Sequence, residues 1–268
     1  MYPVFRRDNG DMSTIDLNSD LGESFGAWKL GDDAAMLQVV TSANVACGFH
    51  AGDPLVMLAC CRTAAEHGVA IGAHVAYRDL AGFGRREMDI PPGELYGDVL
   101  YQLAALAGIA ATVGARVGYV KPHGALYNRI VTDASQASAV ADAVADFDRS
   151  LPLLGLADSA IAHAASDRSL RFVREAFVDR GYRADATLVP RRRPGAVLSG
   201  ATAAGVEAIA ARAVALATGS PIDAADGTTL RLDVDSLCVH GDTPNAVVMA
   251  RAVRSALEDA GIGLEPFA

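Results

Sequence analysis

Basic residues and long apolar runs are scarce in this chain. Its 268 residues carry a net charge of −9 and only two lysines, Lys29 and Lys121. A general nucleic-acid-binding protein needs a basic surface, and the one basic cluster, Arg191 to Arg193, is too short to provide it. No apolar run approaches the roughly 18 residues that a membrane helix requires. We therefore expect no nucleic-acid partner and no membrane span.

Cysteine is also rare, and the four cysteines match neither a C-x-x-C pair nor a zinc-binding pattern: Cys47, Cys60, Cys61 and Cys238. We interpret them as buried, reduced thiols of a cytoplasmic protein. The N-terminal segment lacks an apolar stretch with a small-residue cleavage site, so a signal peptide is not expected. Residues 1–13 are predicted to be a loose extension, with Met12 as a candidate start. Residues 14–268 are predicted to form a single domain.

Two common catalytic arrangements are not expected in this chain. Neither lysine lies in a G-x-x-x-x-G-K-[ST] loop, so a nucleotide, if one is used, is not held by a P-loop of this chain. The G-x-S-x-G spacing occurs at residues 22–26, but no helix is predicted directly after it, so a nucleophile elbow with a serine nucleophile is not expected. The chemistry must therefore come from other residues.

The chain does contain a regular alternation of apolar, β-branched runs with alanine-rich segments. We predict strands at residues 15–18, 39–46, 69–73, 117–121, 151–156, within 170–177, and at 236–239. We predict helices at residues 54–67, 91–114, 133–148, 206–218 and 244–260. Polar groups follow strands all along the chain, whereas an open sheet would concentrate them at one switch point. This pattern favours an α/β fold with a closed or nearly closed (β/α) barrel.

Four of the six histidines end short apolar runs, each with glycine close by: His50, His74, His123 and His240. A side chain at the end of a strand points into whatever lies above the sheet, and glycine lets a ligand approach closely. We therefore expect these histidines to contribute to one polar site. His67 lies within a predicted helix and His163 within an alanine-rich helical stretch, and we interpret both as structural.

Carboxylates and amides follow the first two predicted strands. Asp16, Asn18 and Asp20 alternate, so they share one face of an extended strand. Glu23 follows them, and Asn44 lies in the second strand. Carboxylates in this position could bind a metal or act as a general base, although turn and capping roles are also common for Asp and Asn. Asp53, before Pro54, is most simply a helix N-cap.

The segment V-K-P-H-G-A-L-Y-N carries the strongest local signal. Lys121 ends a strand that is predicted to be buried, where an ammonium group is costly unless it is paired. A lysine in such a place commonly binds an anion or transfers a proton. Tyr127 and Asn128 follow it as candidate ligands of a substrate.

Other polar residues follow later strands or lie in loops. Arg85 and Arg86 lie in a long loop after the third strand and could hold a carboxylate or phosphate, although at least one is expected to be a solvated surface charge. Glu175, Arg191 and Asp242 follow apolar runs and complete the candidate set.

Seven segments taken together resemble the LamB/YcsF family, the A subunits of prokaryotic 5-oxoprolinase. They are D-L-N-S-D-L-G-E-S-F-G, N-V-A-C-G-F-H-A-G-D-P, D-L-A-G-F-G-R-R, V-K-P-H-G-A-L-Y-N, E-A-F-V-D-R-G-Y, L-V-P-R-R-R-P-G-A and C-V-H-G-D-T-P. They run in order from residue 16 to 244, so nearly the whole chain is covered. The family often has cysteine where this chain has Ser19, and H-P-G-Y where this chain has H-V-A-Y at residues 74–77.

The resemblance implies a single-domain distorted (β/α) barrel, similar to that of glycoside hydrolases and deacetylases. It also implies ATP-dependent hydrolytic opening of 5-oxo-L-proline (pyroglutamate) to L-glutamate, with ATP as co-substrate and subunits B and C as partners. A five-membered lactam is a stable amide, and phosphorylation of its carbonyl oxygen would let water attack it.

Such a site needs cations for phosphate and for the substrate carboxylate, and it needs an acid/base pair. We assign catalytic roles to Asp20, Glu23, His50, Lys121, His123 and His240. We assign substrate binding to Asn18, Asn44, His74, Arg85, Tyr127, Asn128, Glu175, Arg191 and Asp242. In this hypothesis Asp20 or a histidine activates water, and Lys121 stabilises an oxyanion or phosphate.

Two alternatives stay open on the sequence alone. One is a metal-dependent hydrolase resembling a carbohydrate deacetylase, with a Zn-like ion held by candidates Asp20, His50, His74 and His123. The other is a non-catalytic subunit that only binds substrate for its partners. A divalent metal could also enter as Mg²⁺ with ATP.

Overall fold

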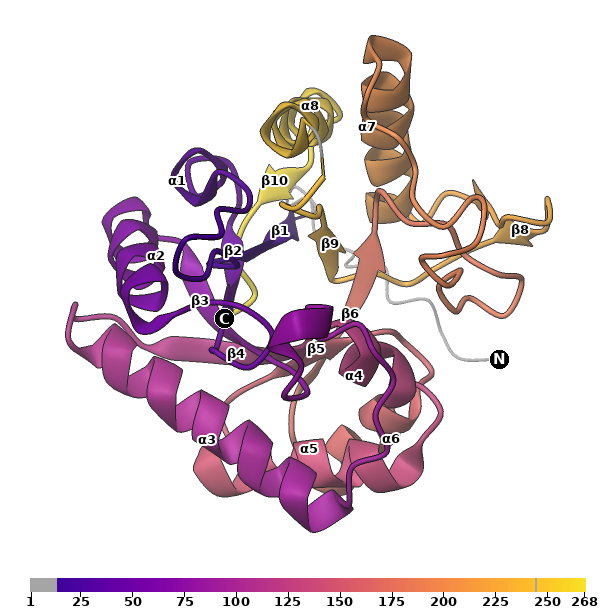
Figure 1. Cartoon of the computed structure of the whole chain (residues 1–268). Helices are drawn as coiled ribbons and strands as arrows, with labels where there is room; N and C mark the ends of the chain where they lie inside the picture. Colours follow the sequence, from indigo (N-terminus) through magenta and orange to yellow (C-terminus); the bar gives the residue numbers. More distant parts are fainter. Residues whose placement is uncertain (1–13, 244) are drawn as a thin grey trace.

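Parallel strands form a closed barrel at the centre of the molecule. The computed structural model describes residues 14–243 and 245–268, so the expected extension at residues 1–13, with Met12, lies outside the described residues. The barrel strands, in order, are β1 (Thr14–Leu21), β2 (Ser42–Ala46), β3 (Ala70–Val75), β4 (Val117–Pro122), β5 (Leu153–Gly155), β6 (Phe172–Phe177) and β9 (Ser236–Cys238). β9 pairs with both β6 and β1, which closes the ring (Figure 1). The expected distorted (β/α) barrel is confirmed.

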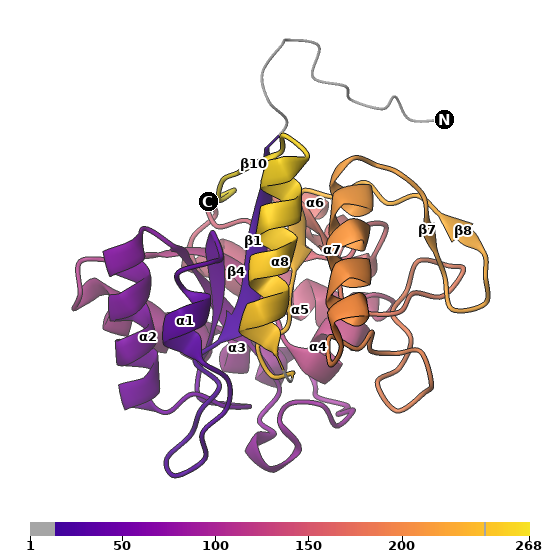
Figure 2. The same cartoon turned by 90° about the horizontal axis from the view of Figure 1, so that it is seen from above.

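Helices cover the outside of the barrel. The longer ones are α2 (Pro54–His67), α3 (Pro92–Ala111), α5 (Ala134–Phe147), α6 (Ala160–Asp167), α7 (Ala203–Ala217) and α8 (Ala246–Asp259). Figure 2 shows α2, the short α1 (Asp33–Met36), α8 and α7 side by side along one flank. Among the described residues, no helix combines the length and the apolar character needed to cross a membrane.

Local signals set the ends of α2 as expected. Asp53 accepts hydrogen bonds from the backbone N–H groups of Leu55 and Val56, Pro54 occupies the first turn, and Gly68 ends the helix in the left-handed region with φ 67°. These are the preferred residues for an N-cap, a first turn and a helix end. The N-cap interpretation of Asp53 is therefore confirmed.

Several short elements were not predicted. They are α1, the 3₁₀ turn η1 (Leu80–Gly82), α4 (Gly124–Arg129), the hairpin of β7 (Ile222–Asp223) and β8 (Thr229–Leu230), and β10 (Gly263–Leu264). Each is shorter than the window in which hydrophobic periodicity can be recognised. The predicted start of the last helix at Pro244 lies outside the described residues.

The two ends of the barrel differ. β10 pairs with the first residues of β1, and the Phe267 ring packs on Tyr119 at 4.8 Å, so the C-terminal segment covers the end where the strands begin. The alternation predicted for β1 is confirmed, because Asp16, Asn18 and Asp20 all form hydrogen bonds to side chains of neighbouring strands. The polar interior therefore continues up to the opposite end, where the strands finish.

Asp16 lies deep in the barrel and does not belong to that site. Its carboxylate accepts hydrogen bonds from Thr41, Ser42 and Ser236. Burial outweighs these bonds and raises the pKa of Asp16 to about 6, from 3.8. The folded state therefore binds the proton of the Asp16 carboxyl group more tightly than the unfolded state does. The stability that this proton contributes is present below pH 4 and is lost as pH rises to 6.

We expect this single carboxyl group to lower the free energy of unfolding by up to about 3 kcal/mol between pH 4 and pH 6, because one pKa unit corresponds to about 1.4 kcal/mol. Asp16→Asn cannot titrate and should lack this component of the slope. Urea unfolding at several pH values measures it. Equal pH slopes for the variant and the wild type would show that Asp16 stays ionised in the folded protein.

Candidate functional site

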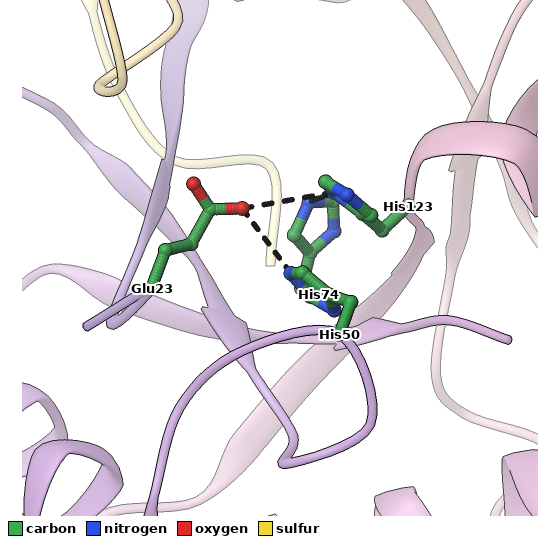
Figure 3. A group of neighbouring side chains, drawn as sticks. All are labelled: Glu23, His50, His74 and His123. Atoms are coloured by element: carbon green, nitrogen blue, oxygen red, sulfur yellow. Dashed lines mark hydrogen bonds and ion pairs between the residues drawn. The ribbon is translucent and has the colours of Figure 1, made fainter. Parts of the chain in front are cut away.

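Three of the four strand-end histidines meet where the strands finish. Glu23 follows β1, His50 follows β2, His74 lies in β3 and His123 follows β4. Each offers one ligand atom, and these atoms lie within 4.8 Å of one another in a buried group. Figure 3 shows the four side chains converging. We call these four residues the His–Glu cluster.

Short contacts hold the His–Glu cluster together. His50 Nε2 lies 3.2 Å from Glu23 Oε1, and His123 Nδ1 lies 3.7 Å from the same oxygen (Figure 3). His123 Nδ1 also lies 2.9 Å from His74 Nε2. The His50 and His123 rings stack at 3.7 Å with 9° between their planes.

The hydrogen bonds around the cluster determine which nitrogens carry protons. His74 Nδ1 lies 3.0 Å from the carbonyl oxygen of Lys121, and His123 Nε2 lies 2.9 Å from that of Phe83. A carbonyl oxygen can only accept, so both of these nitrogens carry hydrogen. In neutral rings His74 Nε2 and His123 Nδ1 would then present lone pairs to each other. One additional positive charge between them, either a shared proton or a metal ion, resolves this conflict.

Burial favours neutral side chains in the cluster. It lowers the pKa of His50 and of His123 well below the ordinary histidine value, and the neighbouring His74 lowers both further. Burial, followed by the charges of Asp20 and Asp242, raises the pKa of Glu23 well above its ordinary value. Neutral imidazoles are the form that binds metal ions. The cluster therefore offers nitrogen donors to a cation without first having to lose protons from His50 and His123.

Lys121 lies beside the cluster and is 1% exposed. Its Nζ lies 2.7 Å from Glu175 Oε1 and 3.0 Å from Asp20 Oδ1, and it donates to Asn18 Oδ1 at 3.2 Å. Burial disfavours the ammonium group, but Asp20, Cys238 and Glu175 hold the pKa of Lys121 well above its ordinary value. Lys121 is therefore a charged, immobilised cation, as its position in the sequence suggested.

Asp20 connects Lys121 to the His–Glu cluster. Its Oδ1 lies 3.3 Å from His74 Nε2 and accepts from Asn44 Nδ2 at 2.9 Å. Burial opposes its ionisation, but His74 and Lys121 hold the pKa of Asp20 well below the ordinary value. The buried group of possible metal ligands contains Glu23 together with the three predicted histidines. Asp20, the other predicted candidate, lies beside this group and contacts both His74 and Lys121.

Two buried groups next to Lys121 leave hydrogen-bonding capacity unused among the residues that the structure describes. They are the carboxylate of Glu175 and the hydroxyl of Tyr127, which have no partner of good geometry beyond the ion pair of Glu175 with Lys121 and their contact with each other. Tyr127 packs its ring against Phe177 at 5.5 Å in an edge-to-face contact. Buried polar groups without partners are costly and commonly await a ligand, so both fit the predicted role in substrate binding.

Charged side chains extend from the cluster toward solvent. Arg85 donates to Asp242 Oδ2 at 2.5 Å, and both are partly exposed. Arg191 is partly exposed too, and its charge lowers the pKa values of Asp179 and Asp242 as one of several causes. Asn128 is different, because it is exposed and bonds to Gly124 O in its own helix. The structure does not bring Asn128 to the site.

Arg86, His67 and His163 lie away from the His–Glu cluster. Arg86 has a side chain 62% exposed and pairs with Asp79, so it is the surface charge expected for one of the two arginines. His67 and His163 are exposed and lie in α2 and α6. None of the three contributes to the cluster.

His240 does not join the other histidines. It follows β9 and pairs through Nδ1 with Asp179, at 2.8 Å from Oδ1 and 3.0 Å from Oδ2. Asp179 is fully buried and was missed from the sequence. The signal was present, because Glu175, Phe177 and Asp179 occupy alternate positions and continue the inward face of β6 beyond its end.

Gly84 packs closely against His50 and His123. It has φ +64°, and a Cβ there would lie 2.7 Å from His123 Cδ2 and 2.8 Å from His50 Cβ. Gly84→Ala should therefore cost about 2–3 kcal/mol of stability and displace the stacked rings. Urea unfolding measures the cost. The control is Gly97→Ala in the exposed part of α3, where a Cβ meets nothing within 4 Å and should stabilise by about 0.5–1 kcal/mol. A neutral Gly84→Ala would contradict the packing described.

The model of the LamB/YcsF family matches residues 15–268. The chain belongs to the LamB/YcsF family. This LamB/YcsF chain is 59% identical over 254 residues to the A subunit of 5-oxoprolinase from Paracidovorax citrulli (strain AAC00-1), covering 95% of this chain and 99% of that protein. It is 57% identical over 256 residues to the A subunit of 5-oxoprolinase from Mycobacterium avium (strain 104). That match covers 96% of this chain and 100% of the other protein.

Solved structures agree with this assignment. The lactam utilization protein from Thermus thermophilus matches with a TM-score of 0.88 and 44% identity, over 95% of this LamB/YcsF chain and 100% of that one. A truncated 3-deoxy-D-arabino-heptulosonate 7-phosphate synthase from Thermotoga maritima matches with a TM-score of 0.50 and 10% identity, over 98% of this chain and 95% of that one. The second likeness concerns the fold alone.

Proposed function

We propose that this chain is the A subunit of a 5-oxoprolinase and that it opens 5-oxo-L-proline to L-glutamate, with ATP as co-substrate and subunits B and C as partners. The observation that carries the proposal is Lys121, a buried cation held between Asp20 and Glu175 beside the His–Glu cluster. The relatives are named as 5-oxoprolinase proteins, which supports the substrate.

The residues suit hydrolysis of an activated lactam. Water adds to the ring carbonyl carbon and loses a proton, negative charge develops on the carbonyl oxygen or its phosphate, and the bond from carbon to the ring nitrogen then breaks. Where that oxygen carries a phosphoryl group, a second water hydrolyses the resulting acyl phosphate to the carboxylate and phosphate. Lys121 stabilises the negative charge in this buried site. Asp20, held ionised by Lys121 and His74, is the candidate base for the attacking water.

The remaining polar groups suit binding of a small cyclic amide with a carboxylate. The Glu175 carboxylate accepts the ring N–H, and the Tyr127 hydroxyl donates to the substrate. Arg85 and Arg191, toward solvent, attract the substrate carboxylate or a phosphate. Because the sequence lacks a P-loop, we assign nucleotide binding to a partner protein of the complex. The use of ATP and the four free, buried cysteines support a cytoplasmic location.

The His–Glu cluster fits a divalent metal ion. Three imidazoles and a carboxylate match the nitrogen and oxygen ligands that Zn²⁺ takes, and the facing lone pairs of His74 and His123 need a cation or a proton. A bound ion would polarise an oxygen atom next to it. The same donor set also suits a metal-dependent deacetylase-like hydrolase, which is the second candidate function.

The purified chain should therefore be assayed with purified subunits B and C. We expect glutamate release from 5-oxoproline that requires ATP, and no acetate release from an acetylated sugar. Acetate release by the chain alone, without ATP, would favour the deacetylase-like hydrolase. Turnover that survives substitution of Lys121 and of each cluster residue would favour a subunit that only binds substrate.

A further inference from the structure

Asp179 and His240 form a buried pair outside the His–Glu cluster. They follow β6 and β9, which are neighbours in the barrel. The two carboxylate oxygens of Asp179 lie 2.8 and 3.0 Å from His240 Nδ1, and Oδ2 also accepts the backbone N–H of His240 at 3.2 Å. Asp179 therefore fixes both the main chain and the ring of His240.

This pairing determines the tautomer of His240. Burial opposes the ionisation of Asp179, but the charge and hydrogen bonds of His240 hold the pKa of Asp179 below its ordinary value. A carboxylate only accepts, so Nδ1 carries the hydrogen. Nε2, at the other side of the ring, has no hydrogen bond to any residue that the structure describes. The His240 side chain is 6% exposed. Nε2 is thus available for proton transfer.

His240 and Lys121 both contact the ring of Phe177. The His240 ring stacks on Phe177 at 5.3 Å with 18° between the planes, and Lys121 Nζ lies 5.1 Å from the centre of the Phe177 ring. His74 and His123 use both ring nitrogens in contacts within and around the cluster. The charges of Asp20 and Asp242 also act on His240, and that of Arg191 acts on Asp179.

We propose that His240 is the general acid of the ring opening and that Asp179 is the positioning residue that holds it for this step. As the bond from the carbonyl carbon to the ring nitrogen breaks, its electron pair stays on the nitrogen. His240 acts here as an imidazolium, in which Nε2 has taken a proton from solvent while the hydrogen on Nδ1 stays with Asp179. The Nε2 proton moves to the ring nitrogen of the lactam, and Nε2 regains its lone pair. An amine leaves far more readily than an amide anion, so this transfer lowers the barrier. The inference rests on the proposed lactam hydrolysis.

Asp179→Asn in the complete complex tests the role. We expect kcat to fall on the order of a hundredfold or more, with little change in KM for 5-oxoproline and an altered pH profile of kcat, because the amide can bond the wrong tautomer. Asp179→Glu should recover part of the activity. The matched control is Asp98→Asn. Asp98 is a buried carboxylate on the outer helix α3, and it pairs with Arg78 in the loop after β3. Unchanged kcat and pH profile in Asp179→Asn would overturn the proposal.

Nitrogen NMR of His240 in the full wild-type chain gives a readout that does not depend on turnover. We expect hydrogen on Nδ1 in the wild type and a shift toward Nε2 in Asp179→Asn. Hydrogen on Nε2 alone in the wild type would overturn the inference even in an active complex. If the NMR result holds but the wild-type complex releases no glutamate, the general-acid assignment fails with the proposed function, whereas Asp179 keeps its role of holding His240.

Discussion

Replacing Lys121 by methionine is expected to reduce ATP-dependent ring opening on the order of a thousandfold in the complete complex. Lys121 is the only lysine in the barrel interior of this two-lysine chain, and Nζ contacts both Asp20 and Glu175. Loss of one preorganised donor to a developing oxyanion costs about a hundredfold to a thousandfold in rate. Methionine keeps much of the side-chain length, so it removes the charge with little change in packing.

The same substitution leaves two buried carboxylates without their cation. Removing one partner of a buried ion pair costs about 3–5 kcal/mol, so the fold must be checked alongside turnover. The double variant Lys121→Met, Glu175→Gln removes one of the unpaired charges and should recover part of the free energy of unfolding without recovering turnover. Lys29→Met changes the other, exposed lysine and serves as the control. Turnover of Lys121→Met close to that of the wild type would remove Lys121 from the mechanism.

Substitution of His74 or His123 by alanine is expected to abolish binding of a divalent ion to the His–Glu cluster. We expect the wild type to bind about one Zn²⁺ per chain, because one carboxylate and three imidazoles complete a four-ligand site. Each histidine supplies a lone pair that faces the other at 2.9 Å, so loss of either breaks the donor set. Elemental analysis after dialysis against Zn²⁺, and calorimetric titration, measure the stoichiometry and affinity.

His163→Ala is the matched control for this experiment, because His163 is an exposed histidine on α6. The His163→Ala variant should bind the same number of Zn²⁺ ions per chain as the wild type. If the wild type binds no ion at all, the two facing nitrogens share a proton, and the cluster acts through its own acid/base groups. Equal zinc binding by the wild type and by both cluster variants would place any metal site elsewhere.

The position of polar residues at strand ends predicts much of the site from the sequence. Polar side chains at the ends of parallel strands must gather on one face of a barrel, and this rule placed His50, His74, His123 and Lys121 correctly at that face. The alternation in β1 also predicted that Asn18 and Asp20 would point inward, as they do. These conclusions depend only on the period of a strand and on the closure of the barrel.

Turns after the strands limited the rest of the prediction. Gly22, at φ +68°, redirects the chain after β1, so Glu23 reaches the histidines while Asp20 stays with Lys121. The presence of Glu23 next to the histidines could not be predicted without the backbone conformation of this turn. Asp179 lies beyond the end of β6, where the alternating pattern continues outside the predicted strand. Asn128 lies in α4, which is too short to be predicted from periodicity, and this helix turns the Asn128 side chain to solvent.

The most direct test of the account is to measure glutamate formed from 5-oxoproline and ATP by purified subunits B and C, with and without this chain. We predict glutamate only when the chain is present, and its loss when the chain carries Lys121→Met. Ring opening by subunits B and C alone, at the rate of the complete mixture, would contradict the claim that the lactam is opened in this barrel.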